Sequence, residues 1–584
     1  MEDQYDASKV HANNGCLCSD PPGSTFCVPG QALQGQGQDC QAQQSRVGTT
    51  FRRGLANVMA RLLTIVKPMP PWHPILGHLY FCYKIASALP KDAHPNYLPD
   101  MIRRKLPDLG PIYYLDTWPF GPQMLVVSST RGLHQIIQEH SLPKYPALKY
   151  FLQPIADGLD LVTMEGNLWK TWRGIFNPGF SAGYLMSLTK SIVVETETFC
   201  GILERLSREH TVFRMKDLTD NLTMDIIGRI VMYGLRLGES YRYADSLKRN
   251  AELDSQRHSN PLVDGLRMQV KWLTFGADVN PITRYNPLRP IVHWYNSWRM
   301  NDYVARIIDS RFTELQSEEG NLVKGNKSII DLVLTAYLSE NAARKSQTMD
   351  STFKRFTMSQ IKLFLFSGHD TTSSTVCYIF YILATNPAVL ARVRAEHVSV
   401  IGPDPSKFAS VIASDPFLLN ELPYTIAVIK EVLRMFPAVS GTRAGEPNFY
   451  VTDDLGRHFP TDGFLVWDNP QVIHRDPIYW QNPDDFIPDR WLVAPDDSLH
   501  PVKGAWRPFS HGPRNCIGQE LAMNEMKVMM VMTAQRFDIG LAYEDMDRTK
   551  RTKAITTVNG ERGYQIGRAQ PSDDLPCRVA ENSG

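Results

Sequence analysis

Apolar residues recur at helical spacing through most of this chain. Long patterns of this kind run from the Pro-rich segment at residues 68–74 to about residue 384. Strand-like stretches are few, namely residues 112–115, 124–127, 449–452 and 463–467. No repeat with a period of about twenty to fifty residues is visible. The pattern predicts a mainly α fold over residues 68–584, a single large helical domain with a small β-sheet portion.

The first fifty residues show no such periodicity. They are rich in Gln, Gly, Ser, Asp and Asn and contain few aliphatic side chains. Because they cannot bury enough apolar surface to offset the entropy of ordering, residues 1–50 are predicted to form a disordered polar tail. Gly35 and Gly37 within this tail match the start of a dinucleotide-binding fingerprint, but Cys40 stands at the third glycine position and no strand precedes it.

Residues 51–67 are predicted to form a basic amphipathic helix. Such a helix lies on a membrane surface or packs on the body of the protein. No window of about 18 uncharged apolar residues exists, so a spanning helix is not expected, and the initial segment is too polar for a secretory signal. The apolar positions of the helix are Leu55, Val58, Met59, Leu62, Leu63 and Val66, and its cations are Arg52, Arg53, Arg61 and Lys67.

Composition and charge narrow the class of protein. The 584 residues are 43% hydrophobic and 21% charged, which excludes a disordered chain and a small disulfide scaffold. With 62 Lys and Arg against 61 Asp and Glu, the chain has no basic field that would hold a nucleic acid. We therefore expect a large globular protein that binds no nucleic acid.

The nine cysteines are spread along the chain and their number is odd, which is typical of a reducing compartment. The first four, Cys16, Cys18, Cys27 and Cys40, lie close together, but their spacing matches no structural zinc motif. We interpret them as incidental, with a zinc site as the alternative.

Residues 509–518 carry the strongest chemical pattern. Their sequence FSHGPRNCIG fits Phe-x-x-Gly-x-Arg-x-Cys-x-Gly. The Gly and Pro predict a tight turn, and residues 519–532 favour a helix, so Cys516 is expected at a helix N-terminus. The N–H groups of a helix end stabilise a thiolate, which is a metal ligand. A cysteine considered alone is more often a small buried hydrophobe, but its surroundings here favour a ligand.

With this motif the chain resembles the cytochrome P-450 family of haem-thiolate monooxygenases, and the other family motifs follow in order between about residues 70 and 541. Glu431 and Arg434 match the Glu-x-x-Arg pair, and Arg490 matches the third partner that the family provides. The resemblance implies a buried network of these three residues that supports the cysteine loop. The alternative is a solvated pair on a helix surface.

A polar segment interrupts the apolar helix that we expect over residues 359–384. Asp370 and Thr371 match the family's proton-delivery pair and are the expected catalytic residues, whereas Ser367 stands where the family has Ala or Gly. We expect a locally opened helix here, with carbonyls and hydroxyls free to hold water. A simple kink is the alternative.

The resemblance also implies which residues bind haem. The two propionates require cations, and arginine pairs with carboxylates in bidentate fashion. The implied cofactor-binding residues are Trp169, Arg173, Arg443, Phe509, Arg514, Cys516 and Gly518, with Cys516 as the axial ligand of the haem iron.

The implied activity is the insertion of one oxygen atom from O2 into a medium-sized hydrophobic substrate. The cofactor would be haem b, with electrons from NADPH through a separate diflavin reductase. Residues 177–181, 370–374 and 488–491 look most like those of filamentous-fungal enzymes of secondary metabolism. A fatty-acid hydroxylase, an O2-independent haem-thiolate isomerase or dehydratase, and a non-catalytic haem carrier or sensor are the alternatives.

The expected location is the cytoplasmic face of the endoplasmic reticulum, with peripheral attachment through the helix at residues 51–67; a soluble cytoplasmic protein is the alternative. Lys170 and Arg507 are candidates for a basic surface that binds the reductase. The substrate pocket is expected at residues 145–161, 364–369 and 439–442.

Overall fold

The computed structural model describes residues 69–73, 76–118, 121–232, 237–248, 260–273, 286–317, 328–341, 348–550 and 556–582. All of them belong to one unit, Lys67–Gly584. The tail predicted at residues 1–50 and the amphipathic helix predicted at residues 51–67 lie outside the described residues.

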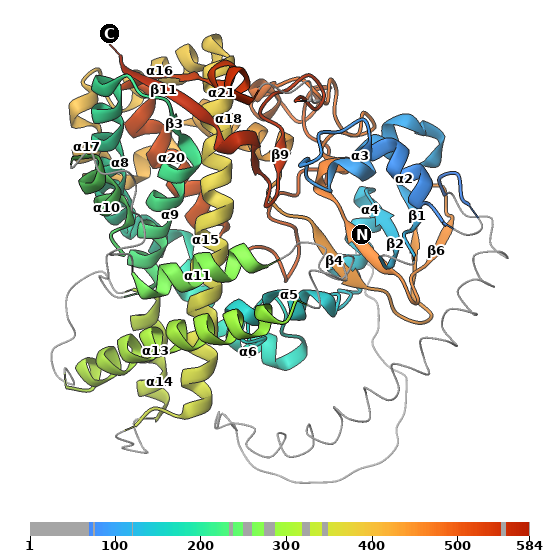
Figure 1. Cartoon of the computed structure of the whole chain (residues 1–584), viewed down its shortest axis with the longest axis horizontal. Coiled ribbons are helices and arrows are strands. Elements are labelled where there is room, and N and C mark those ends of the chain that lie inside the picture. Colours follow the sequence, from blue (N-terminus) through green and yellow to red (C-terminus); the bar gives the residue numbers. More distant parts are fainter. Residues whose placement is uncertain are drawn as a thin grey trace, which may run out of the picture. The chain divides into compact units, whose positions relative to one another are not determined.

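Helices make up most of the fold, as the apolar pattern predicts (Figure 1). The bounds of the helices in chain order are α2 Leu79–Ala86, α3 Tyr97–Lys105, α4 Thr130–His134, α5 Ala147–Ala156, α6 Gly166–Phe176, α7 Ala182–Ser187, α8 Thr189–Glu209, α9 Met215–Val231, α10 Glu239–Lys248, α11 Pro261–Trp272, α13 Leu288–Ser317, α14 Ile329–Asn341, α15 Ser351–Thr385, α16 Pro387–Val400, α17 Phe408–Ser414, α18 Pro423–Met435, α19 Pro470–Ile473, α20 Gln519–Ala534 and α21 Tyr543–Lys550.

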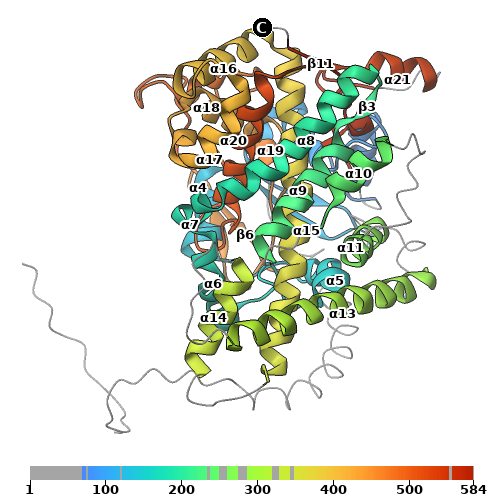
Figure 2. The same ribbon diagram turned by 90° about the vertical axis from the view of Figure 1, so that its left-hand side faces the viewer.

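The long helix α15 runs through the middle of the helical part, with α9 beside it (Figures 1 and 2). It begins at Ser351, eight residues before the predicted start, because the side chain of Asp350 accepts a hydrogen bond from the N–H of Phe353 and caps the helix. The two helices pack closely at Gly368, where a Cβ atom would lie 2.8 Å from Cγ1 of Ile227. A glycine at this point therefore sets the distance between α15 and α9.

Among the helices that the structure describes, none alone is long and apolar enough to cross a bilayer. The helices α15 and α16, bent by 108° at the break between them, meet that criterion only when they are taken together.

The strands form four small sheets. The largest has the order β1-β2-β7-β4, with β2 and β7 parallel and the other neighbours antiparallel. The strands predicted at 112–115, 124–127, 449–452 and 463–467 are confirmed as β1, β2, β5 and β7. The bounds are β1 Ile112–Asp116, β2 Gln123–Val127, β3 Phe213–Arg214, β4 Gly441–Ala444, β5 Tyr450–Thr452, β6 His458–Pro460, β7 Leu465–Asp468, β8 Phe537–Leu541, β9 Gln565–Ile566, β10 Gln570–Pro571 and β11 Pro576–Glu581.

The apolar core divides along the same lines. One cluster fills the space between the helices around α15, and a second lies against the four-stranded sheet, where Tyr114, Leu125 and Val466 are buried. Strand β7 joins the sheet to the segment that follows it, and β4 leads from α18 into the sheet. The sheet therefore holds both ends of the region that carries the site.

Gly445, directly after β4, is the tightest point of this region. Its N–H donates to the carbonyl of Phe464 at 2.9 Å, and a Cβ atom at this position would lie 1.7 Å from the carbonyl oxygen of Thr461. We predict that Gly445→Ala destabilises the protein by about 1–3 kcal/mol, because the backbone would have to move apart. Gly540→Ala in β8 is the control, since a Cβ there meets no atom within 4 Å. Urea unfolding followed by circular dichroism measures both; equal midpoints would contradict the prediction.

Candidate active site

Three buried residues join α18 to the 3-10 helix η7 (Pro488–Trp491). Oε1 of Glu431 accepts hydrogen bonds from Nη2 of Arg434 at 2.8 Å and from Nε of Arg490 at 2.9 Å. Oε2 accepts from Nε of Arg434 and from Nε1 of Trp491, both at 3.0 Å. The ionic side chains are 0% exposed, so the alternative of a solvated surface pair is wrong.

The remaining donors of this network go to backbone carbonyls. Nη1 of Arg434 donates to the carbonyls of His474 and Pro483, and Nη1 of Arg490 donates to that of Gln481. Two guanidinium groups face one carboxylate, and the carbonyl dipoles stabilise the excess positive charge. Because these carbonyls belong to residues 474–485, the network fixes the segment between β7 and η7.

His474 connects the network to the loop that leads to the cysteine. Its Nδ1 lies 3.0 Å from the carbonyl oxygen of Arg434, and its Nε2 accepts a hydrogen bond from the backbone N–H of Arg507 at 2.9 Å. Since Nε2 accepts, Nδ1 carries the proton and donates. Burial, followed by the charge of Arg434, holds the pKa of His474 well below its usual value, so the ring is neutral. A second link joins Nε1 of Trp506 to the carbonyl of Lys430 at 3.1 Å.

Cys516 lies at the end of this loop, just before α20, as the sequence predicts. Its N–H donates to the carbonyl of Phe509 at 2.9 Å, and the residue before α20 is Gly518. A Cβ on Gly518 would lie 3.9 Å from Sγ of Cys516, so that side of the thiol is open. Gly512 has φ +73°, which only glycine adopts without strain. The loop therefore presents the sulfur while its backbone stays closed.

The thiol of Cys516 faces an internal space. Its side chain is accessible to a water-sized sphere. Nevertheless burial raises the pKa of the thiol, against the smaller opposing effects of the Gly518 N–H and of Arg173. A side chain that is both accessible and desolvated lies inside the protein beside room for another group. We take the burial as describing the thiol's surroundings and the exposure as describing that room.

Arg173, on α6, is committed to the cysteine loop. Its Nη1 and Nη2 donate to the carbonyl and to Oδ1 of Asn515, both at 3.1 Å, and its Nε donates to Oδ1 of Asn177 at 2.8 Å. All three bonds hold the residue that precedes Cys516. Arg173 thus positions the loop as well as adding positive charge near the sulfur.

Arg514 and Trp169 lie together, with the guanidinium carbon 4.7 Å from the centre of the indole ring. Nη1 of Arg514 donates to Glu165 at 2.5 Å, and Nη2 donates to the carbonyls of Val162 and Met164 at 3.2 and 2.8 Å. The sequence placed Arg514 and Trp169 at the cofactor independently, and the structure brings them into contact.

A cluster of cations lies near Asp468 of β7. Arg443 of β4 is 3% exposed and donates from Nη1 to the carbonyl of Leu142 at 3.0 Å. Lys144 pairs with Arg443 in an isolated β-bridge; burial and the charges of Arg443 and Arg514 lower its pKa to about 7. Nε and Nη2 of Arg507 are buried without a hydrogen-bond partner.

Four cations, Lys144, Arg443, Arg507 and Arg514, thus stand near two acids, Glu165 and Asp468, in the part of the chain that the structure describes. Buried guanidinium groups without enough partners are costly, and a group with two carboxylates would complete them. The site therefore fits haem, whose propionates carry that charge. Lys144 escaped the sequence analysis because its pairing with Arg443 joins residues 299 positions apart.

Arg507 is not part of a docking surface, contrary to the expectation. It is 3% exposed, because it lies beneath the loop and near Asp468, with 4.0 Å between Nη2 and Oδ2. Lys170, the other candidate, is exposed.

The expected opening of the helix at Asp370 and Thr371 is wrong. Helix α15 continues through this segment. The hydroxyl of Thr371 donates to the carbonyl of Ser367 at 2.7 Å, and that of Ser367 donates to the carbonyl of Leu363 at 2.8 Å. Each hydroxyl bonds a carbonyl one turn earlier, which the intact helix allows, so the polar residues satisfy themselves without breaking a turn.

Asp370 points toward α9. Its Oδ1 lies 3.3 Å from Nζ of Lys216 and 3.2 Å from Nη1 of Arg568. Lys216 also pairs with Asp220, and Thr219 bonds Ser373 at 2.8 Å. Neither cation could be found from the sequence, because Lys216 is 154 residues before Asp370 and Arg568 lies beyond the cysteine loop.

Comparison with known proteins gives a consistent result. The family model for cytochrome P450 matches residues 68–567. Cytochrome P450 monooxygenase polC of Polytolypa hystricis is 40% identical over 527 residues, covering 89% of this chain and 91% of the relative. Cytochrome P450 monooxygenase acrF of Aspergillus aculeatus is 31% identical over 85% of this chain and 99% of the relative.

Among solved structures, the cytochrome P450DA heme domain aligns with a TM-score of 0.64 at 20% identity, covering 88% of this chain and 98% of that structure. The mainly α fold expected from the sequence is therefore confirmed.

We predict that Glu431→Ala prevents retention of haem. The change leaves Arg434 and Arg490 buried without their carboxylate, at a cost of roughly 3–5 kcal/mol, and releases the segment that supports the loop. Arg392→Ala is the control, because Arg392 pairs with Asp489 of the same 3-10 helix while 52% of its side chain is exposed. Haem per protein after purification measures both. Normal haem content in Glu431→Ala would show that the network does not support the site.

Proposed function

We propose that this chain, which belongs to the cytochrome P450 family, inserts one oxygen atom from O2 into a medium-sized hydrophobic substrate of fungal secondary metabolism. The observation that carries the proposal is the thiol of Cys516, accessible inside the protein at the start of α20 and held by a loop tied to α18. The similarity to two fungal monooxygenases supports the reaction class and the metabolic setting.

Haem b, when bound, supplies the activation of O2, since an axial thiolate favours cleavage of the O–O bond. Cys516 would provide that thiolate. Arg443, Lys144 and Arg507 would bind the propionates, and Arg173 would keep the Cys516 loop in place through Asn515.

Phe509, Gly518, Trp169 and Arg514 complete the site. The Phe509 carbonyl fixes the backbone of Cys516, and Gly518 leaves room beside its sulfur. Trp169 and Arg514 would close the side of α6, where the guanidinium lies against the indole ring.

Asp370 and Thr371 would deliver protons during the reaction. The carboxylate lies between Lys216, in the interior, and Arg568, whose side chain is 28% exposed, so it stands between the core and water. The Thr371 hydroxyl is one residue further along α15. This pair favours an oxygenase over an isomerase or dehydratase, since rearranging a peroxide requires no proton relay.

The family takes its electrons from a separate redox partner, and we propose an NADPH-dependent diflavin reductase. Lys170 is exposed on α6, the helix that also holds the cysteine loop through Arg173, and is the residue of this chain that we assign to that contact. We also propose peripheral attachment to the cytoplasmic face of the endoplasmic reticulum, on the basis of the sequence pattern at residues 51–67.

The assignment of Cys516 predicts a spectroscopic signature. Reduced wild-type protein with carbon monoxide should show the red-shifted Soret band of a thiolate ligand, and Cys516→His should shift the band to the shorter wavelength of an imidazole ligand. In a host that supplies the reductase, the wild type should yield oxidised metabolites that are missing with the variant. An imidazole-type spectrum of the wild type would refute the assignment.

The proton relay predicts that Thr371→Ala lowers the product formed per NADPH by roughly 100-fold and raises the hydrogen peroxide released, because a positioned proton donor is lost. Thr371→Ser should restore coupling. Thr375→Ala is the matched control, since its hydroxyl makes the same bond one turn later, at 2.9 Å from the carbonyl of Thr371. Equal coupling in the two alanine variants would remove Thr371 from the relay.

A further inference from the structure

The first part of α13 exposes five large apolar side chains. Leu288, Ile291, Trp294, Tyr295 and Trp298 are 58%, 62%, 69%, 50% and 57% exposed. At 3.6 residues per turn they occupy about 120° of the helix circumference. We call these five residues the α13 aromatic face. Scattered exposed apolar residues are normal in soluble proteins, whereas a contiguous set marks an interaction surface.

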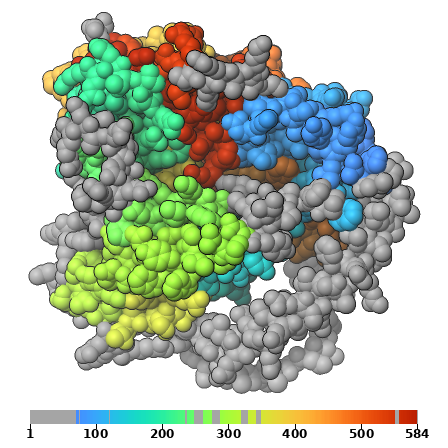
Figure 3. Space-filling model, viewed as in Figure 1, coloured from blue at the N-terminus to red at the C-terminus, as the bar shows by residue number. Residues whose placement is uncertain are grey.

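The other side of the same helix already packs against the protein. Met300, Val304 and Ile308 are 0% exposed. A Cβ on Gly265 of α11 would lie 2.7 Å from Cγ of Met300, so the two helices are in close contact. The α13 segment lies on the side of the molecule shown in Figure 3, where it is coloured light green. Packing of the core therefore explains one face of α13 and leaves the aromatic face without a role in folding.

The charges around the aromatic face have one sign. Residues 286–301 contain Arg289 and Arg299 and no Asp or Glu. The guanidinium carbon of Arg299 lies 5.7 Å from the ring centre of Tyr295, so this cation and the ring belong to the same surface. Lys271 on the neighbouring α11 is exposed and adds a further cation.

Two tryptophans, a tyrosine and flanking arginines are the residues that settle at the boundary between lipid and water. Their rings combine an apolar body with a polar N–H or O–H group, and cations attract anionic headgroups. A second copy of this chain is a poorer fit, because a symmetric contact would bring the arginines of both copies together.

We propose that the α13 aromatic face lies on an anionic phospholipid membrane. The proposal goes beyond the oxygenase activity, since it concerns where the folded protein rests. It also adds a second contact to the amphipathic helix predicted at residues 51–67. Two weak contacts in one chain bind a surface more tightly than either does alone.

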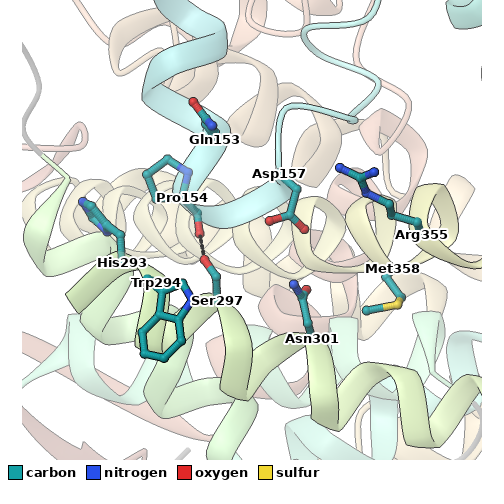
Figure 4. A pocket seen from close by; sticks show the side chains of 9 residues that line it. All are labelled: Gln153, Pro154, Asp157, His293, Trp294, Ser297, Asn301, Arg355 and Met358. Atoms are coloured by element: carbon teal, nitrogen blue, oxygen red, sulfur yellow. Dashed lines mark hydrogen bonds between the residues drawn. The ribbon is translucent and has the colours of Figure 1, made fainter. Parts of the chain in front are cut away.

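The same turn of α13 borders a cavity of about 500 Å³ (Figure 4). Trp294, Ser297 and Asn301 line it from α13, and Pro154 of α5 and Met358 of α15 line it from the other side. Trp294 therefore belongs both to the membrane-facing surface and to a cavity that touches the helix of Asp370 and Thr371. A membrane-dissolved substrate would meet the protein at this residue.

The test uses full-length, haem-loaded protein and sedimentation with vesicles of phosphatidylcholine, alone or mixed with phosphatidylserine. We expect binding to the mixed vesicles and release at high salt. Ile291→Glu combined with Trp298→Glu should lower the partition coefficient roughly tenfold or more. The control combines Phe417→Glu with Leu455→Glu, which are 63% and 78% exposed outside α13, and should bind as the wild type does.

A second measurement places the face in the lipid. Nitroxide-labelled lipids should quench part of the tryptophan fluorescence of the bound wild type. Trp294→Phe combined with Trp298→Phe should still bind, since phenylalanine remains apolar, but should lose that part of the quenching.

The proposal is overturned if the wild type does not bind, if the Ile291 and Trp298 variant binds normally, or if the phenylalanine variant is quenched like the wild type. It is also overturned if the glutamate variant changes the oligomeric state in vesicle-free solution, which would assign the face to a second copy. Leu62→Glu with Leu63→Glu tests the other helix separately; complete loss of binding in that variant alone would assign attachment to residues 51–67. Haem content and the carbon monoxide spectrum, measured on the same samples, report on the oxygenase proposal independently.

Discussion

The carboxylate of Glu431 is the constraint on which the site depends. It is the shared acceptor of two guanidinium groups that are 0% exposed, and those groups in turn hold the carbonyls of residues 474–485. Such an arrangement tolerates little movement, because each displaced donor would be left buried and unpaired. Its value lies in fixing geometry: a neutral core of the same volume could be as stable, but it would not orient three segments at once.

From this network the constraint passes to the sulfur through a short series of contacts. Arg434 fixes His474, His474 fixes the backbone at Arg507, and the loop then closes on Cys516 through the carbonyl of Phe509. Arg173 secures the same loop from α6. The thiol is therefore positioned from two directions by elements that lie far apart in sequence, and neither contact involves the sulfur itself.

The fold class, four of the strands and the helix after Cys516 follow from local pattern, because periodicity and turn residues act within a few positions. The motifs also located Glu431, Arg434 and Arg490. Lys144, Lys216, His474 and Arg568 could not be found in this way, since their roles arise from pairings that only the folded chain creates. The expectation of an opened helix failed because Ser367 and Thr371 bond within their own helix. Arg507 was assigned to the surface because a sequence does not show which side of a loop faces inward.

The neutral ring of His474 has a consequence for the behaviour of the protein in acid. Both of its nitrogens are used, one as donor and one as acceptor, so a second proton would set two donors against each other at the N–H of Arg507. Because the pKa of the folded state lies below that of the unfolded chain, the unfolded chain binds more protons as the pH falls through the unfolded value, and stability declines. Acid would thus act first at the hinge between α18 and the cysteine loop, and the cofactor would be released from a protein whose helices are still folded.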